Sequence, residues 1–270
     1  MDNETAPAPS GKSAEAATGG QARAALLKRA KRLNVPLRRE FVQLNDQNKT
    51  RASVLASFVN TGAQRSLRAY LTVLAASSAE DELGWYTEFD SMVWARLFDA
   101  HEAATTASAR TAAWRTLQQL ADKNLVEVSR VKGSRKIGVR LLREDGSGKP
   151  YTRPGLGNND PYFNIPTTFW TKGFDEVVGL PGLAMLLVLC GERKWRMILP
   201  EHMPKWYGWS ADTTERGLKT VMELNLVERR EKRKAAPLSP LGFTRYFEYR
   251  VRPIMRPKVQ RQRAESGAAA

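Results

Sequence analysis

Apolar positions in the stretch 106–142 first follow the spacing of a helix and then the alternation of strands. Four apolar residues of the first half share one helical face: Ala113, Leu117, Leu120 and Ala121. Ser108 or a neighbouring residue has a side chain suited to capping the start of that helix. Asn124 suits the left-handed conformation in which many helices end. The pattern therefore predicts a capped helix that ends at about Asn124.

Two strands joined by a basic turn follow this helix in the predicted order. The apolar positions of the first strand are Leu125, Val126 and Val128, and those of the return strand are Ile137, Val139 and Leu141. Between them, residues 132–136 read Lys-Gly-Ser-Arg-Lys, which is a basic turn. The stretch therefore predicts a helix followed by a β-hairpin with a positively charged tip.

The same pattern occurs a second time, 101 residues further along the chain. Asn-Leu-Val-Glu at 124–127 recurs at 225–228, and at the same offset Arg115 matches Arg216 and Leu117 matches Leu218. The agreement extends through the helix as well as the identical tetrapeptide. We therefore expect a tandem repeat of one structural unit.

Upstream elements complete each expected unit. In the first, the pattern predicts a helix from Ser66, a strand at Trp85 and Tyr86, a helix from Phe89 to Phe98, and a turn at 100–106. In the second, it predicts an apolar helix at 182–190, a strand at 195–199, a short helix at 200–206 that begins with proline, and a turn at 208. A third helix capped by Ser210 then leads into the hairpin.

The whole chain divides into six expected segments. They are a disordered tail at 1–20, a basic helical arm with a short strand at 21–60, a first domain at 61–143, a linker at 144–164, a second domain at 165–253 and a basic disordered tail at 254–270. The linker is more than a bare spacer, because its Tyr151, Arg153 and Tyr162 are suited to packing or to contact with DNA. The short strand is expected at Phe41, Val42 and Leu44. Two interpretations of the arm remain open: it follows DNA phosphates, or it packs through Leu26 and Leu27.

Charge and cysteine content narrow the classes of partner. The 270 residues carry a net charge of +15, which favours nucleic acid or another anionic surface over a neutral ligand, although a solvated basic surface also fits. A single cysteine, Cys190, excludes an internal disulfide and suits a reducing cytoplasm. The apolar run around it is too short for a membrane span, and residues 1–20 lack the apolar core of a secretory signal.

Helix, strand, basic hairpin and strand form the second half of a winged helix-turn-helix, and both units resemble domains of this bacterial type. The resemblance covers residues 66–142 and 165–253. Two such domains with basic tails resemble plasmid replication initiators, accessory factors of conjugative plasmids and transcriptional regulators, and the sequence does not choose among them. The expected fold class is α+β, with two tandem winged helix-turn-helix domains and disordered basic tails.

The resemblance implies that each third helix lies in a major groove of double-stranded DNA and each wing lies along a backbone or minor groove. The expected helix contacts are Thr111, Arg115 and Gln118 in the first unit and Arg216, Lys219 and Thr220 in the second. The expected wing contacts are Lys132, Arg135 and Lys136 in the first unit and Arg230, Lys232 and Arg233 in the second. Alternatively, Arg115 and Arg216 each form a salt bridge, and Gln118 is only solvated. Asp212 and Glu215 fit poorly against phosphate.

Catalytic chemistry is not indicated. His101 and His202 stand apart, with no Cys or second His at ligand spacing, so neither a metal nor a cofactor is expected. Acidic residues at 80–82, with Glu88 and Asp90, are interpreted as solvated loop residues and not as a nuclease metal site. We expect a cytoplasmic DNA-binding protein, associated with nucleoid or plasmid, that is not an enzyme. The alternatives are a winged-helix protein-docking module and a binder of structured RNA, and a homodimer stays open.

Overall fold

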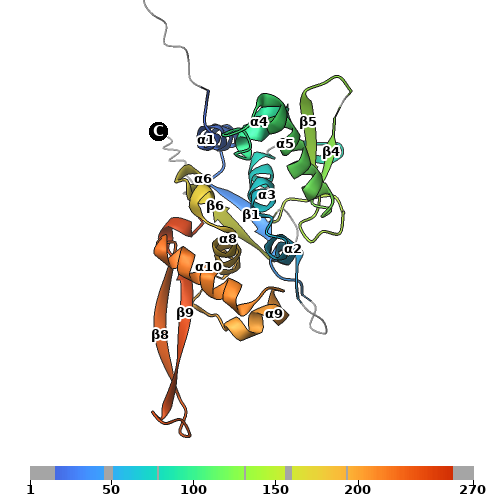
Figure 1. Cartoon of the computed structure of the whole chain (residues 1–270). Coiled ribbons are helices and arrows are strands. Elements are labelled where there is room, and N and C mark those ends of the chain that lie inside the picture. Colours follow the sequence, from blue (N-terminus) through green and yellow to red (C-terminus); the bar gives the residue numbers. More distant parts are fainter. Residues whose placement is uncertain are drawn as a thin grey trace, which may run out of the picture.

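The computed structural model describes residues 16–45, 51–77, 79–130, 132–155, 160–192 and 194–257. Within these residues the chain is a mixed α+β protein whose strands form three small antiparallel sheets (Figure 1). This confirms the expected α+β class. Most of the two expected disordered tails, residues 1–15 and 258–270, lies outside the described residues.

The first unit contains three helices and a four-stranded sheet. Its elements in chain order are α3 (Gln64–Ala76), β2 (Ala79–Asp81), β3 (Gly84–Asp90), α4 (Ser91–Leu97), α5 (Thr106–Ala121), β4 (Val126–Ser129) and β5 (Lys136–Leu141). The strands lie in the order β2-β3-β5-β4. The hairpin partner of β4 is therefore also the neighbour of β3, which ties the C-terminal hairpin to the strand that precedes α4.

Local chemistry sets the boundaries of α4 and α5. The Asp90 carboxylate accepts a hydrogen bond from the Met92 N–H at 2.7 Å, so α4 begins at Ser91, and Phe89 belongs to the strand and not to the helix. The cap of α5 is Thr105, whose hydroxyl accepts from the Ser108 N–H at 3.3 Å. The buried indole of Trp94 donates to the Ile137 carbonyl at 3.0 Å and fixes α4 to β5.

The second unit repeats this order around a three-stranded sheet. Its elements are α8 (Leu180–Cys190), β7 (Arg196–Met197), η2 (Pro200–His202), α9 (Met203–Trp206), α10 (Ala211–Glu223), β8 (Val227–Ala235) and β9 (Phe243–Val251). The strand order β7-β9-β8 matches β3-β5-β4 of the first unit. Ser210 caps α10, as expected, by accepting a hydrogen bond from the Thr213 N–H at 3.1 Å.

The junction between third helix and hairpin is the same in both units. Asn124 has a φ of 53°, so it ends its helix in the left-handed region as predicted, and Asn225 at the matching position has a φ of 58°. The next N–H bends back to the helix in each case: Leu125 donates to the Leu120 carbonyl at 3.1 Å, and Leu226 donates to the Val221 carbonyl at 2.9 Å. The repeat found in the sequence is therefore a repeat of backbone conformation.

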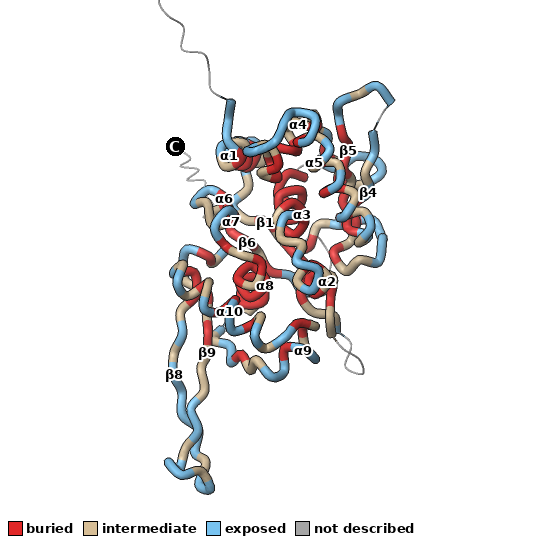
Figure 2. The backbone as a smooth tube through the Cα atoms, viewed as in Figure 1, coloured by how far each residue is buried: buried red, intermediate tan, exposed pale blue. Residues whose placement is uncertain are grey.

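Segments outside the two units form a shared layer between them. A two-stranded sheet pairs β1 (Asn34–Arg38) with β6 (Tyr162–Pro166). The helices of this layer are α1 (Gly19–Ala30), η1 (Arg39–Phe41), α2 (Val54–Asn60), α6 (Thr168–Thr171), α7 (Phe174–Val177) and η3 (Pro253–Met255). Figure 2 shows the buried residues continuing from α3 through this layer into α8. The two units therefore share one continuous core.

The strand predicted at 41–44 is wrong, because the strand lies at 34–38. Val35 and Leu37 are fully buried on one face of β1, and Phe41 lies in the 3-10 helix that follows. Pro36 is tolerated inside β1 because this strand has a single strand partner, so Pro36 is not required to donate to a second one.

The arm at 21–33 packs against the body of the protein. Its helix α1 begins at Gly19, inside the expected tail, because Thr18 and Gln21 form a capping box. Leu26 and Leu27 are buried, and the Arg23 guanidinium is 2% exposed, with ion pairs to Asp99 at 2.8 Å and Asp175 at 2.6 Å. The packed interpretation of the arm is therefore the one that the structure shows.

The segment expected to be a linker, 144–164, is part of the fold. Glu144 is completely buried and forms an ion pair with the equally buried Arg38. The same guanidinium donates to Asp160 at 2.8 Å and to the Thr152 carbonyl at 2.7 Å. A buried charge requires such partners, and Glu144, Thr152 and Asp160 all belong to this segment. The described residues of this segment are therefore packed against β1, which agrees with the packed interpretation of the linker, and the division of the chain into two domains stays a prediction.

Candidate nucleic-acid interface

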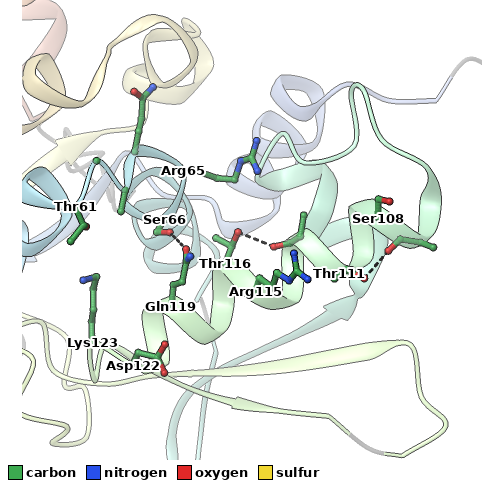
Figure 3. A pocket seen from close by; sticks show the side chains of 15 residues that line it. Thr61, Arg65, Ser66, Ser108, Thr111, Arg115, Thr116, Gln119, Asp122 and Lys123 are labelled. Atoms are coloured by element: carbon green, nitrogen blue, oxygen red, sulfur yellow. Dashed lines mark hydrogen bonds between the residues drawn. The ribbon is translucent and has the colours of Figure 1, made fainter.

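A groove of about 930 Å³ runs along the polar face of α5. Its walls are α5, the start of α3 and the turn at 61–63 (Figure 3). Thr111 and Arg115, two of the expected helix contacts, are exposed and line it. We call this feature the α5 groove.

Positive charge reaches the α5 groove from three elements. Arg115 projects from the middle of α5, Arg65 from the first turn of α3, and Lys123 from the residues after α5, with Asp122 as the one acidic lining residue among those described. Lys123 is partly held in place, because its Nζ donates to the Ser57 hydroxyl at 3.0 Å and lies 5.0 Å from the centre of the Phe58 ring. The groove is therefore cationic and lined by hydroxyl and amide groups.

Gln119, and not Gln118, lines this groove. Gln118 is half-buried on the flank of α5, whereas Gln119 is exposed and its Oε1 accepts a hydrogen bond from the Ser66 hydroxyl at 2.5 Å (Figure 3). Gln118, an expected helix contact, therefore lies beside this groove and not in it, and its contact with DNA stays a prediction. A shift of one position is 100° around a helix, enough to move a side chain to the neighbouring face.

The first hairpin carries its three expected cations on the surface. Lys136 is in an ion pair with Glu88 at 3.1 Å, whereas Lys132 and Arg135 have no carboxylate partner among the described residues. The backbone at Arg135 is fixed, because its carbonyl accepts from the Ser91 N–H at 2.8 Å. Two of the three wing cations are thus free to meet an anion beside α5.

The face of α10 that matches the α5 groove is different in charge. Arg216 is in an ion pair with Asp212 at 2.9 Å, and Lys219 lies 4.0 Å from Glu223. Exposed Glu215 adds a further negative charge. Thr220 is half-buried and packs at Gly182 of α8, so it is partly withdrawn from the surface. The salt-bridge interpretation therefore holds for Arg216, while Arg115 has no ion-pair partner among the described residues.

The second hairpin is long and extends away from the body (Figure 1). Each strand has nine residues, against four and six in the first hairpin. Arg230 lies at its base, in an ion pair with Glu248 at 2.6 Å and 4.4 Å from the centre of the Trp195 ring. Arg233 lies 3.4 Å from Glu231 and 4.8 Å from the Phe243 ring centre, and Lys232 is exposed without an ion-pair partner among the described residues.

The cations of the α5 groove that sequence reasoning missed are Arg65 and Lys123. Both lie near a predicted helix end and outside the apolar repeat, so the helical pattern of α5 gave no signal for them. Only the approach of α3 to α5 places Arg65 beside Arg115. Proximity of that kind depends on packing and is not visible in spacing along one helix.

Three of the five acidic residues that raised a nuclease alternative have structural partners. Asp81 accepts a hydrogen bond from Arg140 at 2.5 Å, and this bond lowers the pKa of its carboxyl. Asp90 caps α4, and Glu88 pairs with Lys136. No group of three potential metal ligands occurs among the described residues, and none of the helices in that part of the chain is long and apolar enough to cross a membrane.

Comparison of the chain with models of known protein families finds no match, and comparison with curated proteins also finds none.

Proposed function

We propose that this protein binds double-stranded DNA through two units of the winged helix-turn-helix type. The observation that carries the proposal is the repeated unit: helix, strand, helix, helix and hairpin occur twice with the same strand order and the same left-handed asparagine. In DNA-binding proteins of this type the third helix enters the major groove and the hairpin lies beside it. Here the first unit supports that role with an exposed cationic face on α5.

The dimensions of α5 support this mode of binding. Its 16 residues extend about 24 Å, and its exposed side chains near the middle are Thr111 and Arg115. A major groove about 12 Å wide admits one helix. Arg115 is placed for a base edge or phosphate, with Lys132 and Arg135 on the adjacent hairpin for the backbone. The proposal therefore assigns sequence reading to the first unit.

The second unit is assigned mainly to backbone contact. The α10 face carries paired charges, whereas the β8–β9 hairpin has exposed cations at Arg229, Lys232, Lys234 and Arg245. Contacts to phosphate depend on charge and are independent of sequence. The proposed biological role, taken from the resemblance in sequence, is plasmid replication or transfer, or transcriptional regulation, in the cytoplasm.

Selection of duplexes from a random pool, followed by fluorescence anisotropy on the selected sequence, tests the proposal. The full chain is expected to bind the selected duplex tightly at 50 mM salt and far more weakly at 200 mM salt, by about three orders of magnitude if six phosphates are contacted. Absence of duplex binding at low salt would refute it. Equal competition by structured RNA, or a partner protein retained after nuclease treatment without DNA affinity, would favour the other two functions.

A further inference from the structure

The outer part of the β8–β9 hairpin is a free two-stranded arm. β7 pairs with β9 only at Glu248 and Tyr249, so beyond that point the two strands have only each other as partners. Five residue pairs remain, from Glu231 with Phe247 to Ala235 with Phe243. At about 3.4 Å per residue they extend roughly 17 Å from the body. Figure 2 shows this arm as exposed or intermediate along its length.

Two consecutive proline turns close the tip of the arm. Residues 236–239 read Ala-Pro-Leu-Ser and residues 239–242 read Ser-Pro-Leu-Gly. Ser239 N–H donates to the Ala236 carbonyl, and Gly242 N–H donates to the Ser239 carbonyl, each at 2.9 Å. Proline at the second position presets both turns, and neither leucine has a positive φ. The tip is therefore an ordered double turn.

Each turn presents a leucine to solvent. Leu238 is 102% exposed and Leu241 is 67% exposed, the first being the most exposed large apolar side chain among the described residues. Proline favours both turns and Gly242 takes the positive φ of the second, but neither turn requires leucine at its third position. Two leucines at the end of an arm therefore have no packing role in the monomer, which points to a surface that they meet outside it.

Cations flank the tip on both faces of the arm. Residues that are paired across an antiparallel ladder share a face, so Lys232 and Lys234 lie with Tyr246 on one face, and Arg233 lies with Arg245 on the other. Glu231 is the single acidic residue of the five pairs. The polar surroundings of the two leucines thus suit a polyanion, and a neutral apolar partner would leave those charges unused.

We propose that the tip enters a DNA minor groove and inserts Leu238 and Leu241 against base steps, so that the arm bends the duplex. This inference rests on the proposed function. Leucine is one of the side chains that act as wedges in minor grooves, where partial unstacking kinks the duplex. The arm is long enough for the leucines to reach past the phosphates while Lys232, Lys234 and Arg245 neutralise them on either side.

The test compares four forms of the full chain on the selected duplex. The first is wild type, the second carries Leu238→Ser with Leu241→Ser, the third carries Leu83→Ser, and the fourth carries Leu238→Met with Leu241→Met. Leu83 is a matched control because it is also a turn leucine, 74% exposed, between β2 and β3 of the first unit. Bending is measured by energy transfer between dyes at the two duplex ends, and unstacking by 2-aminopurine placed at successive positions.

Wild type and Leu83→Ser are expected to shorten the end-to-end distance and to raise 2-aminopurine fluorescence at one or two adjacent steps. The double variant is expected to lose both signals and to bind about tenfold more weakly. Leu238→Met with Leu241→Met is expected to restore them. Because both leucines are solvent-exposed, the melting temperature of the double variant is expected to match that of wild type, which separates the result from misfolding.

Bending and unstacking that survive in the double serine variant would overturn the wedge and leave the proposed function intact. The wedge also fails if the double variant keeps its DNA signals but loses a partner protein or binding to anionic vesicles. A wild-type chain that binds no duplex at low salt would instead remove the proposed function, and the wedge with it.

Discussion

Arg115 and Arg216 occupy the same position of the repeat, yet reversing their charge is expected to weaken DNA binding unequally. Arg115 is exposed in the α5 groove and has no ion-pair partner among the described residues. Arg216 is in an ion pair with Asp212 at 2.9 Å. Its charge is already offset on its own helix, so less of it is available to a phosphate or base.

The expected size of the difference follows from these surroundings. A bidentate arginine contact to a base contributes about 1–3 kcal/mol, so Arg115→Glu is expected to weaken binding by roughly 10- to 100-fold. Arg216→Glu places a third acid beside Asp212 and Glu215 on α10, and without a close DNA contact its long-range effect is screened within about 8 Å. We expect it to weaken binding by less than about threefold.

Anisotropy titrations at several salt concentrations separate a base contact from a phosphate contact. If Arg115 reads a base, Arg115→Gln lowers discrimination between the selected duplex and a scrambled duplex and leaves the salt slope almost unchanged. If it contacts phosphate, affinity falls equally for both duplexes and the slope decreases by about one. Arg65→Gln, on the opposite wall of the α5 groove, reports whether the duplex reaches that wall.

Equal losses for Arg115→Glu and Arg216→Glu would refute this reasoning, because the ion pair with Asp212 would then have no protective effect. A larger loss for Arg216→Glu would transfer sequence reading to the second unit. Gln118→Glu serves as a further comparison, since its half-buried position on the flank of α5 predicts a smaller effect than the same change at Gln119.

Three changes test the fold that positions these surfaces. Burial raises the pKa of the Asp175 carboxyl to about 6, above its unfolded value of about 3.8. Above pH 6 the ionised carboxylate therefore lowers the free energy of unfolding by up to about 3 kcal/mol, and this loss of stability disappears as pH falls from 6 to 4. Asp175→Asn also removes the 2.6 Å partner of Arg23 at every pH, so the prediction concerns only the pH dependence. Urea unfolding should show Asp175→Asn more stable relative to wild type at pH 7.5 than at pH 4.5, and an equal difference at both would contradict it. Glu144→Ala leaves Arg38 buried without its main partner and should lower the free energy of unfolding by about 3–5 kcal/mol in the same assay, and a loss below 1 kcal/mol would contradict it. Gly217→Ala brings a methyl group to 2.3 Å from the Pro181 carbonyl oxygen of α8 and should cost roughly 1–3 kcal/mol, whereas Lys219→Ala on the exposed face should be nearly neutral.

The helix ends, the caps and the apolar helix faces of the repeat were predictable because each is determined by residues close together in the sequence. The left-handed ends at Asn124 and Asn225, the Ser210 cap and the apolar faces of the third helices each depend on residues within one or two turns. Periodicity also located α3 and α8. The direction of a side chain at the edge of a helical face was harder to predict, because it depends on what packs beside the helix. Gln119 lines the α5 groove, whereas Gln118 is half-buried beside it.

The layer between the units was not predictable in the same way. Gly, Pro and Asn in the segment 144–164 are typical of a linker, and nothing nearby indicates that Glu144 meets Arg38, 106 residues earlier in the chain. The β1–β6 pairing joins residues that are even further apart in the chain, such as Asn34 and Pro166. Such contacts form because the whole core packs together. A sequence pattern can therefore indicate which residues are buried, but it does not indicate which distant residue each of them contacts.

That packed layer has a consequence for the proposed DNA recognition, because it fixes the distance between the two units where a flexible linker would leave it variable. A linker would let the first unit and the β8–β9 arm find their sites at many spacings. A shared core with the buried Arg38–Glu144 pair holds them at one spacing and one rotation about the duplex axis.

Inserting five base pairs between the two contacted regions of the selected duplex turns one of them to the opposite side of the helix, whereas inserting ten restores the side but changes the distance. Both insertions are expected to reduce the affinity to that of the first unit alone. The reference value for the first unit is the affinity of a variant whose arm is disabled by four combined changes, Leu238→Ser, Leu241→Ser, Lys232→Ser and Lys234→Ser. Affinity unchanged by either insertion would mean that the two regions move independently in solution or that only one of them contacts DNA.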